Sequence, residues 1–230
     1  MEIGRDLILL HGAICSANCF KDLTEKLQQK YIVHTPNFSG HGGAPMAEFF
    51  SIEQFASEVL NYLSEKNIDQ IDIFGYSMGG YVALYLAKMH PERVRRIFTL
   101  GTKFEWTPAI AEREVKMLNA DEIAEKIPTF AQQLEKRHAP NDWKVLLGKT
   151  AEMMMALGHK NPLLLEDYRY ILNSVRIAIG DKDQVVTLEE TIAVYRNLPN
   201  ATFMVLPNTP HPIAKTDMEK LSREIKDFFN

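Results

Sequence analysis

The chain has 230 residues, which for an α/β protein corresponds to one domain with an insertion. Hydrophobic residues make up 46% and charged residues 24%, a composition that excludes disordered, collagen-like and coiled-coil chains. The net charge is −4 and there is no basic run, so neither nucleic acid nor a membrane surface is expected as a partner. With no membrane-length apolar stretch and no signal-peptide pattern, a cytoplasmic protein is expected.

The two cysteines of the chain, Cys15 and Cys19, lie four positions apart. They are too few and too close together for a disulfide framework or a zinc site, and we interpret them as typical of a reducing compartment. No metal and no other cofactor is expected.

Short apolar runs alternate with helical patterns over the first hundred residues, which is typical of a parallel sheet. Strands are expected at 7–10, 31–35, 71–74 and 96–100, with helices between them at about 16–29, 52–66 and 81–89. Strand patterns then vanish until about residue 173 and return at 175–179 and 202–206. We therefore expect residues 1–102 and 174–230 to form the core, with 103–173 as a helical insertion.

The strongest local motif is Gly75-Tyr76-Ser77-Met78-Gly79, a Gly-x-Ser-x-Gly sequence between a predicted strand and a predicted helix. The glycines allow a turn that is too tight for side chains, and this turn exposes the serine hydroxyl at the carboxyl edge of the sheet. The following helix directs free N–H groups toward the same point. We therefore expect Ser77 to be a nucleophile rather than a passive serine in a glycine turn.

A serine nucleophile needs a general base and an acid that orients the base. His211 follows the last predicted strand and so lies at the same sheet edge, with His41 in a Gly-rich loop as the main rival. The acid is expected after the strand at 175–179, where either Asp181 or Asp183 fits.

Acyl transfer also needs two backbone N–H donors that hold the oxyanion. Met78, directly after Ser77, is expected to supply one, and Ala13, in the loop after the first strand, the other. His11 and Cys15 lie near Ala13 and are candidates for lining the pocket, although a buried structural role is the simpler interpretation of each.

Trp143 and Met154 lie in the last long helix expected in the insertion. The apolar stripe to which they belong either lines an acyl pocket or packs the insertion onto the core. Packing is the simpler interpretation.

Four segments together resemble the α/β-hydrolase superfamily over essentially the whole chain: His11-Gly12, Gly75 to Gly80, Gly180 to Asp183, and His211. The resemblance implies a mostly parallel sheet of about six strands flanked by helices, with 103–173 as a helical lid. It also implies that Asp183, the fourth residue of Gly-x-x-Asp, is the acid and that His41 is structural. One departure is that Pro210 and Pro212 flank His211, where the family usually has glycine before the histidine.

The leading functional hypothesis is hydrolysis of a small or medium carboxylic ester or thioester through an acyl-enzyme on Ser77. A small-molecule substrate is the expected partner. Two alternatives stay open: carbon–carbon bond hydrolysis or lyase chemistry on a carbonyl substrate with the same triad, and non-catalytic ligand binding on this fold.

Overall fold

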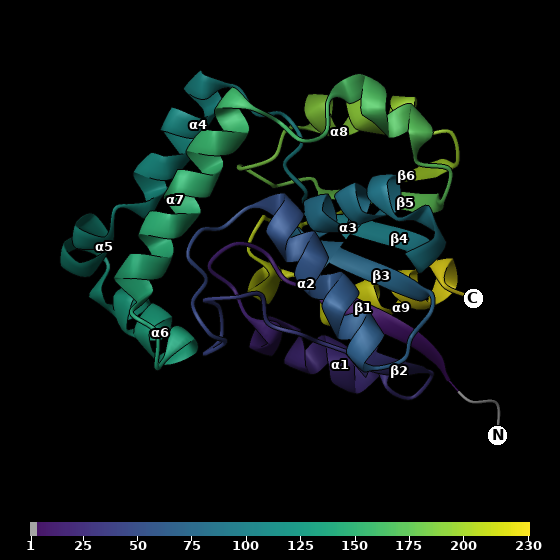
Figure 1. The fold of residues 1–230 in the computed structure, drawn as a ribbon, viewed down its shortest axis with the longest axis horizontal. Helices are drawn as coiled ribbons and strands as arrows, with labels where there is room; N and C mark the ends of the chain where they lie inside the picture. The colour runs from purple at the N-terminus through teal and green to yellow at the C-terminus, as the bar shows by residue number, and fades with distance from the viewer. Residues whose placement is uncertain (1–3) are drawn as a thin grey trace.

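The computed structural model describes residues 4–230 and contains one sheet of six parallel strands, in the order β2-β1-β3-β4-β5-β6 (Figure 1). The strands are β1 Arg5–Leu10, β2 Tyr31–His34, β3 Ile71–Tyr76, β4 Val94–Leu100, β5 Ser174–Gly180 and β6 Ala201–Leu206. The predicted α/β-hydrolase architecture with about six strands is confirmed. The strand order reverses at β1, which has β2 on one side and β3 on the other. In open α/β sheets, ligands bind at such a switch point, beyond the carboxyl ends of the strands.

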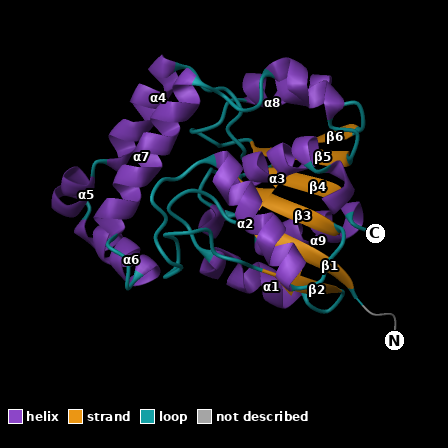
Figure 2. Ribbon diagram, viewed as in Figure 1, coloured by secondary structure: helices purple, strands orange, loops and turns teal. Residues whose placement is uncertain are grey.

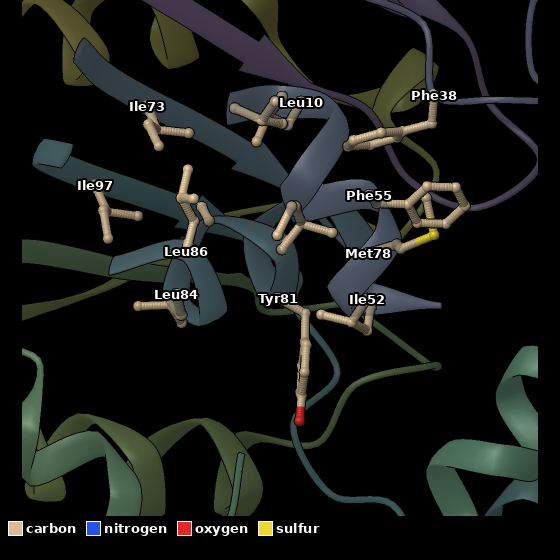
Figure 3. Close-up of a cluster of buried hydrophobic side chains, with 14 of the residues drawn as sticks. Leu10, Phe38, Ile52, Phe55, Ile73, Met78, Tyr81, Leu84, Leu86 and Ile97 are labelled. Carbon is tan, nitrogen blue, oxygen red and sulfur yellow. The ribbon is translucent and has the colours of Figure 1, made fainter. Parts of the chain in front are cut away.

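Helices cover both faces of the sheet (Figure 2). One face carries α2 Ile52–Glu65, α3 Met78–Met89 and α8 Leu188–Asn197, and the other carries α1 Lys21–Leu27 and α9 Met218–Phe228. Leu10 of β1 joins the core beneath α2 and α3 (Figure 3), as Ile8 does, whereas Leu7 and Leu9 join the core beneath α1 and α9. Burial on both faces explains why β1 is a continuous apolar run. None of the helices within residues 4–230 is long and apolar enough to cross a membrane.

The first turn of α3 lies directly against the end of β1. A Cβ atom on Gly79 would lie 2.8 Å from the carbonyl oxygen of His11 and would overlap the carbonyl of Leu10. A Cβ atom on Gly75 would overlap Gly80. These positions hold glycine because backbone from another segment occupies the space of a side chain.

The chain between β4 and β5, as far as the structure describes it, forms helices and no strand. The α-helices are α4 Pro108–Val115, α5 Ala120–Lys126, α6 Pro128–His138 and α7 Trp143–His159, and they lie to one side of the sheet (Figure 1). We call residues 103–173 the lid. Trp143, Leu147 and Met153 of α7 are buried in the same continuous cluster of side chains as α2 and α3. Within the lid, α7 contacts α4, α5 and α6.

The sulfurs of Cys15 and Cys19 are joined in a disulfide, which corrects the expectation of unpaired cysteines. A turn of 3-10 helix, Ala17–Phe20, brings the two Cα atoms to 6.5 Å, within the range that a disulfide spans. The spacing did not indicate this bond, because a single pair of cysteines four positions apart is too small a set to be read as a disulfide framework. The disulfide removes the cysteine argument for a reducing compartment, and a cytoplasmic location stays a prediction.

Gly79→Ala is expected to lower the free energy of unfolding by about 3 kcal/mol or more, because the new methyl group can be accommodated only if α3 moves away from β1. Chemical denaturation followed by circular dichroism measures the change. Gly148→Ala in α7 is the matched control, since nothing lies within 4 Å of the added atom, and it should leave stability unchanged or raise it by about 0.5–1 kcal/mol. Similar losses in both variants would contradict the packing argument.

Candidate active site

Ser77 connects β3 to α3 with φ of +52° and ψ of −120°, a conformation that residues other than glycine rarely adopt. Its N–H donates to the carbonyl of Leu100 at 2.9 Å, and its own carbonyl accepts from the hydroxyl of Thr102 at 3.1 Å. Both partners lie at the end of the neighbouring strand β4 or just after it. The Gly-x-Ser-x-Gly motif thus forms a strained turn from strand to helix, the geometry in which a serine can serve as a nucleophile.

His211 lies within hydrogen-bond distance of both Ser77 and Asp183. Its Nε2 is 3.3 Å from Ser77 Oγ, and its Nδ1 is 2.8 Å from Asp183 Oδ2. Because the carboxylate can only accept, Nδ1 carries the ring proton and Nε2 is left to accept from the serine hydroxyl. The structure therefore brings together the three side chains that the sequence analysis expects to be catalytic.

Asp183, and not Asp181, faces His211. Burial raises the pKa of the Asp183 carboxyl, but the hydrogen bond from His211 and two backbone amides at 2.9 Å outweigh burial, so this pKa lies below its ordinary value. The Asp181 carboxylate instead accepts from the N–H of Thr209 at 3.0 Å. Asp181 therefore orders the loop that leads to His211.

Tyr76 and Gly101 hold the histidine in place, and the sequence analysis did not consider either. The Tyr76 hydroxyl donates to the backbone carbonyl of His211 at 2.9 Å. Gly101 has φ of +59°, and a Cβ atom there would lie 3.1 Å from Asp183 Oδ2 and 3.4 Å from His211 Nδ1. The signals in the sequence were a tyrosine inside the serine motif and a glycine directly after β4.

The turn Gly12–Cys15 places Ala13 beside Ser77. Ala13 and Met78 both line the pocket that contains Ser77. Met78 is the first residue of α3, so its N–H has no acceptor in a preceding helical turn. The turn is closed by the Cys15 N–H, which donates to the Gly12 carbonyl at 3.2 Å and leaves the Ala13 N–H out of this bond. A Cβ atom on Gly12 would lie 3.0 Å from the Cβ of Ser77, so glycine is what permits this close approach.

The pocket lies between the core and the lid, beside Ser77 and Met78. Its lining is mostly apolar and includes Ile52, Trp106, Met153, Met154, Leu157 and Val185. Of the four candidates for pocket lining, Met154 lines the pocket, although packing was the simpler interpretation, whereas His11, Cys15 and Trp143 are not among the lining residues. His11 is fully buried and hydrogen-bonded to backbone, Cys15 is bonded to Cys19, and Trp143 packs into the core.

Tyr81, Lys103 and Trp106 also line the pocket, and the sequence analysis did not anticipate them. Tyr81 lies one helical turn after Ser77, on the same side of α3. Lys103 and Trp106 follow β4, whose carboxyl end lies beside that of β3. Two signals in the sequence could have identified them: the helical spacing of Tyr81 from Ser77, and the position of Lys103 and Trp106 after a strand.

Three buried histidines, His11, His41 and His138, lie together where the lid meets the core. The ring centroids of His11 and His41 are 5.1 Å apart, and those of His41 and His138 are 5.8 Å apart. Each ring donates one N–H to a backbone carbonyl. Burial lowers the pKa of His11 and of His138 to about 4 and holds the pKa of His41 well below its ordinary value, so all three are neutral at pH 7. His41 belongs to this cluster and not to the residues around Ser77.

No group of three or more His, Cys, Asp or Glu side chains within residues 4–230 is arranged to hold a metal ion.

Residues 7–151 match the family model described as alpha/beta hydrolase fold. This match spans more than half of the chain, and the chain belongs to the α/β-hydrolase fold family. Its curated relatives are esterases, and together with the fold they make the chain a hydrolase of the serine type.

One such relative is the pimeloyl-[acyl-carrier protein] methyl ester esterase of Neisseria meningitidis serogroup C, to which the chain is 27% identical over 97% of its own length and 93% of the relative's. The enzyme of the same name from Aeromonas hydrophila is 32% identical over 65% of this chain and 62% of that one.

Solved structures agree with this architecture. A putative lipase from Acinetobacter baumannii superposes with a TM-score of 0.85 at 19% identity, over 100% of this chain and 84% of that one. The enol-lactonase from Burkholderia xenovorans gives a TM-score of 0.80 at 17% identity, over 98% and 91% of the two chains. At these identities the superpositions establish the fold alone.

Acid is expected to destabilise the protein through the three buried histidines. Their folded-state pKa values lie below the ordinary value of about 6.5, so between pH 6.5 and pH 4 the unfolded chain binds protons that the folded chain does not. The free energy of unfolding, measured by urea denaturation, should be at its full value above pH 6.5. It should then fall by several kcal/mol toward pH 4.

His11→Asn removes one of these groups and keeps a neutral polar side chain, so its stability should depend less steeply on pH than that of the wild type. His159→Asn changes an exposed histidine at the end of α7 and is the matched control, expected to follow the wild type. A His11→Asn profile parallel to that of the wild type would show that the cluster is not the source of acid sensitivity.

Proposed function

We propose that the chain hydrolyses a carboxylic ester with an apolar acyl group of medium length, through an acyl-enzyme on Ser77. The observation that carries the proposal is the contact of Ser77, His211 and Asp183 at the edge of an apolar pocket. Non-catalytic ligand binding would not require a base within hydrogen-bond distance of a strained, partly buried serine that lines the pocket.

In the proposed reaction, Ser77 Oγ attacks the ester carbonyl carbon while His211 Nε2 takes the hydroxyl proton. The backbone amides of Ala13 and Met78 hold the oxyanion, and Asp183 stabilises the imidazolium. The bond to the alcohol oxygen then breaks as His211 returns the proton to the leaving alcohol. A water molecule, activated by His211 in the same way, cleaves the acyl-enzyme, releases the acid and restores Ser77.

For the substrate we propose a methyl ester, because the curated relatives are named as esterases for pimeloyl-[acyl-carrier protein] methyl ester. An apolar lining suits a chain of methylene groups, and the flexible side chains of Met153 and Met154 can adapt to its path. The ester group reaches Ser77, and the far end of the acyl chain, with any carrier attached to it, points away from the nucleophile.

The charge of the pocket favours an ester over the carbon–carbon bond alternative. Cleavage of a carbon–carbon bond beside a carbonyl passes through an enolate, which a free cation in the pocket would stabilise. Lys103 is the basic residue in the pocket lining, and its Nζ is already engaged: it donates to the Val185 carbonyl at 3.2 Å and lies 3.4 Å from Glu190 Oε1. Glu114, the acidic residue in the pocket lining, is paired with Arg113 at 2.8 Å. These pairings leave the pocket suited to a neutral substrate.

The wild-type protein is expected to hydrolyse methyl esters of medium-length acyl groups faster than it hydrolyses methyl acetate. Ser77→Ala should lose at least about 10⁴-fold in rate, because no other side chain supplies the nucleophile. Released acid measures the rate, and thermal unfolding establishes that the variant is folded.

A fluorophosphonate tests the nucleophile without reference to the substrate. One adduct per chain is expected by intact-mass analysis of the wild type, and none in Ser77→Ala. Turnover retained by a folded Ser77→Ala protein would refute the nucleophile. Equal rates on acetate and medium-length esters would refute the acyl-chain assignment alone.

Asp183→Asn is expected to lower kcat by about 10³- to 10⁴-fold, since an amide at this position favours the wrong tautomer of His211. Asp181→Asn is the matched control from the same loop. It removes one hydrogen bond to Thr209 and should cost less than about 10-fold. A larger loss from Asp181→Asn than from Asp183→Asn would overturn the choice of acid.

A further inference from the structure

The carbonyl of Ile14, one residue after Ala13, is held by two side chains of the lid. Arg137 Nη1 donates to this oxygen at 2.8 Å, and His138 Nε2 lies 3.1 Å from it. Both side chains lie in the last turn of α6, which docks on the core loops (Figure 1). The lid therefore makes a direct hydrogen-bonded contact with the turn that carries the proposed oxyanion donor.

The burial and hydrogen-bond partners of the two lid residues show how each is directed at the Ile14 carbonyl. His138 is fully buried, and its second ring nitrogen, Nδ1, accepts from the N–H of Gly42 at 3.1 Å, so its proton sits on Nε2 and points at Ile14. Arg137 is partly buried, and no carboxylate within residues 4–230 forms an ion pair with it. Within these residues its hydrogen bond goes to the Ile14 carbonyl, and a bond from a charged donor is stronger than one between neutral groups.

The backbone of Ile14 explains what the contact does. Ile14 has φ of +52°, a conformation that is strained for a β-branched residue and is kept only where its surroundings enforce it. If Ile14 relaxed to a negative φ, the peptide that follows it would rotate. The bond from the Cys15 N–H to the Gly12 carbonyl would then break, and the Ala13 amide between them would move.

We propose that Arg137 and His138 are positioning residues which, through the Ile14 carbonyl, hold the Ala13 N–H in the oxyanion hole. The active site is then complete only when α6 is seated on the core. This inference rests on the proposed function, in which the Ala13 amide binds the oxyanion.

Arg137→Met and His138→Leu are expected to lower kcat for a p-nitrophenyl ester by about 10- to 100-fold, the effect of misplacing a catalytic group by about 1 Å, with KM changed less than about 3-fold. Affinity for a trifluoromethyl ketone should fall in parallel. Its carbonyl carbon accepts Ser77 Oγ, the serine proton passes to His211, and the ketone oxygen becomes an oxyanion in the hole. Affinity for the product acid should stay within about 3-fold of the wild type.

Three further variants separate positioning from folding. Lys136→Met removes the same charge from an exposed site on α6 and should behave as the wild type. His138→Gln keeps a donor and an acceptor and should retain more activity than His138→Leu. Ile14→Gly placed in the Arg137→Met background should recover most of the lost kcat, because glycine adopts a positive φ without strain.

The proposal is overturned if kcat and ketone affinity stay at wild-type values in folded Arg137→Met and His138→Leu. It is also overturned if Ile14→Gly brings no recovery. The rates at which the wild type and Ser77→Ala hydrolyse the same ester test the proposed function separately. If these two proteins are equally inactive, the proposed function fails, whereas an active wild type with unaffected lid variants overturns the positioning role alone.

Discussion

The approach of α3 to the end of β1 is the constraint on which the site depends. Because Gly79 has no side chain, the helix begins directly against the carbonyl oxygens of Leu10 and His11. This brings Ser77 against Gly12, so the proposed nucleophile and the turn that carries the proposed oxyanion donor belong to one packed unit. The unfavourable backbone conformation of Ser77 persists because contacts from two neighbouring strands enforce it.

The sheet and the three residues of the triad could be predicted because both are encoded locally. A parallel strand buried on both faces is an apolar run that can be located in the sequence, and its last residue marks the carboxyl edge of the sheet. Ser77 and Asp183 each follow such a strand, and His211 follows the partly exposed edge strand β6, so the topology of the sheet brings all three to the same edge. Local signals narrowed the acid to two aspartates, and the family pattern then favoured the one that contacts the histidine.

Features that arise between distant segments could not be predicted in this way. The histidine cluster combines the end of β1, a loop after β2 and the lid helix α6, and no spacing in the sequence relates these segments. Lys103 lines the pocket because Glu190, which lies 87 positions away, pairs with it there. The disulfide was missed for a local reason, because one pair of cysteines four positions apart does not form the framework by which disulfides are recognised in a sequence.

The two ends of the lid meet the core through different physical interactions, and this difference has a consequence for catalysis. At the end of α6, contacts are hydrogen bonds with fixed geometry: His138 bonds to two core loops, and Asn141 donates to the carbonyls of Gly40 and Ala44 at 3.0 and 2.7 Å. Over the pocket, α7 presents methionines, whose contacts are apolar and carry little directional preference. The surface over the acyl pocket can therefore adjust to different acyl groups. The end of the lid beside the Gly12–Cys15 turn stays fixed in position.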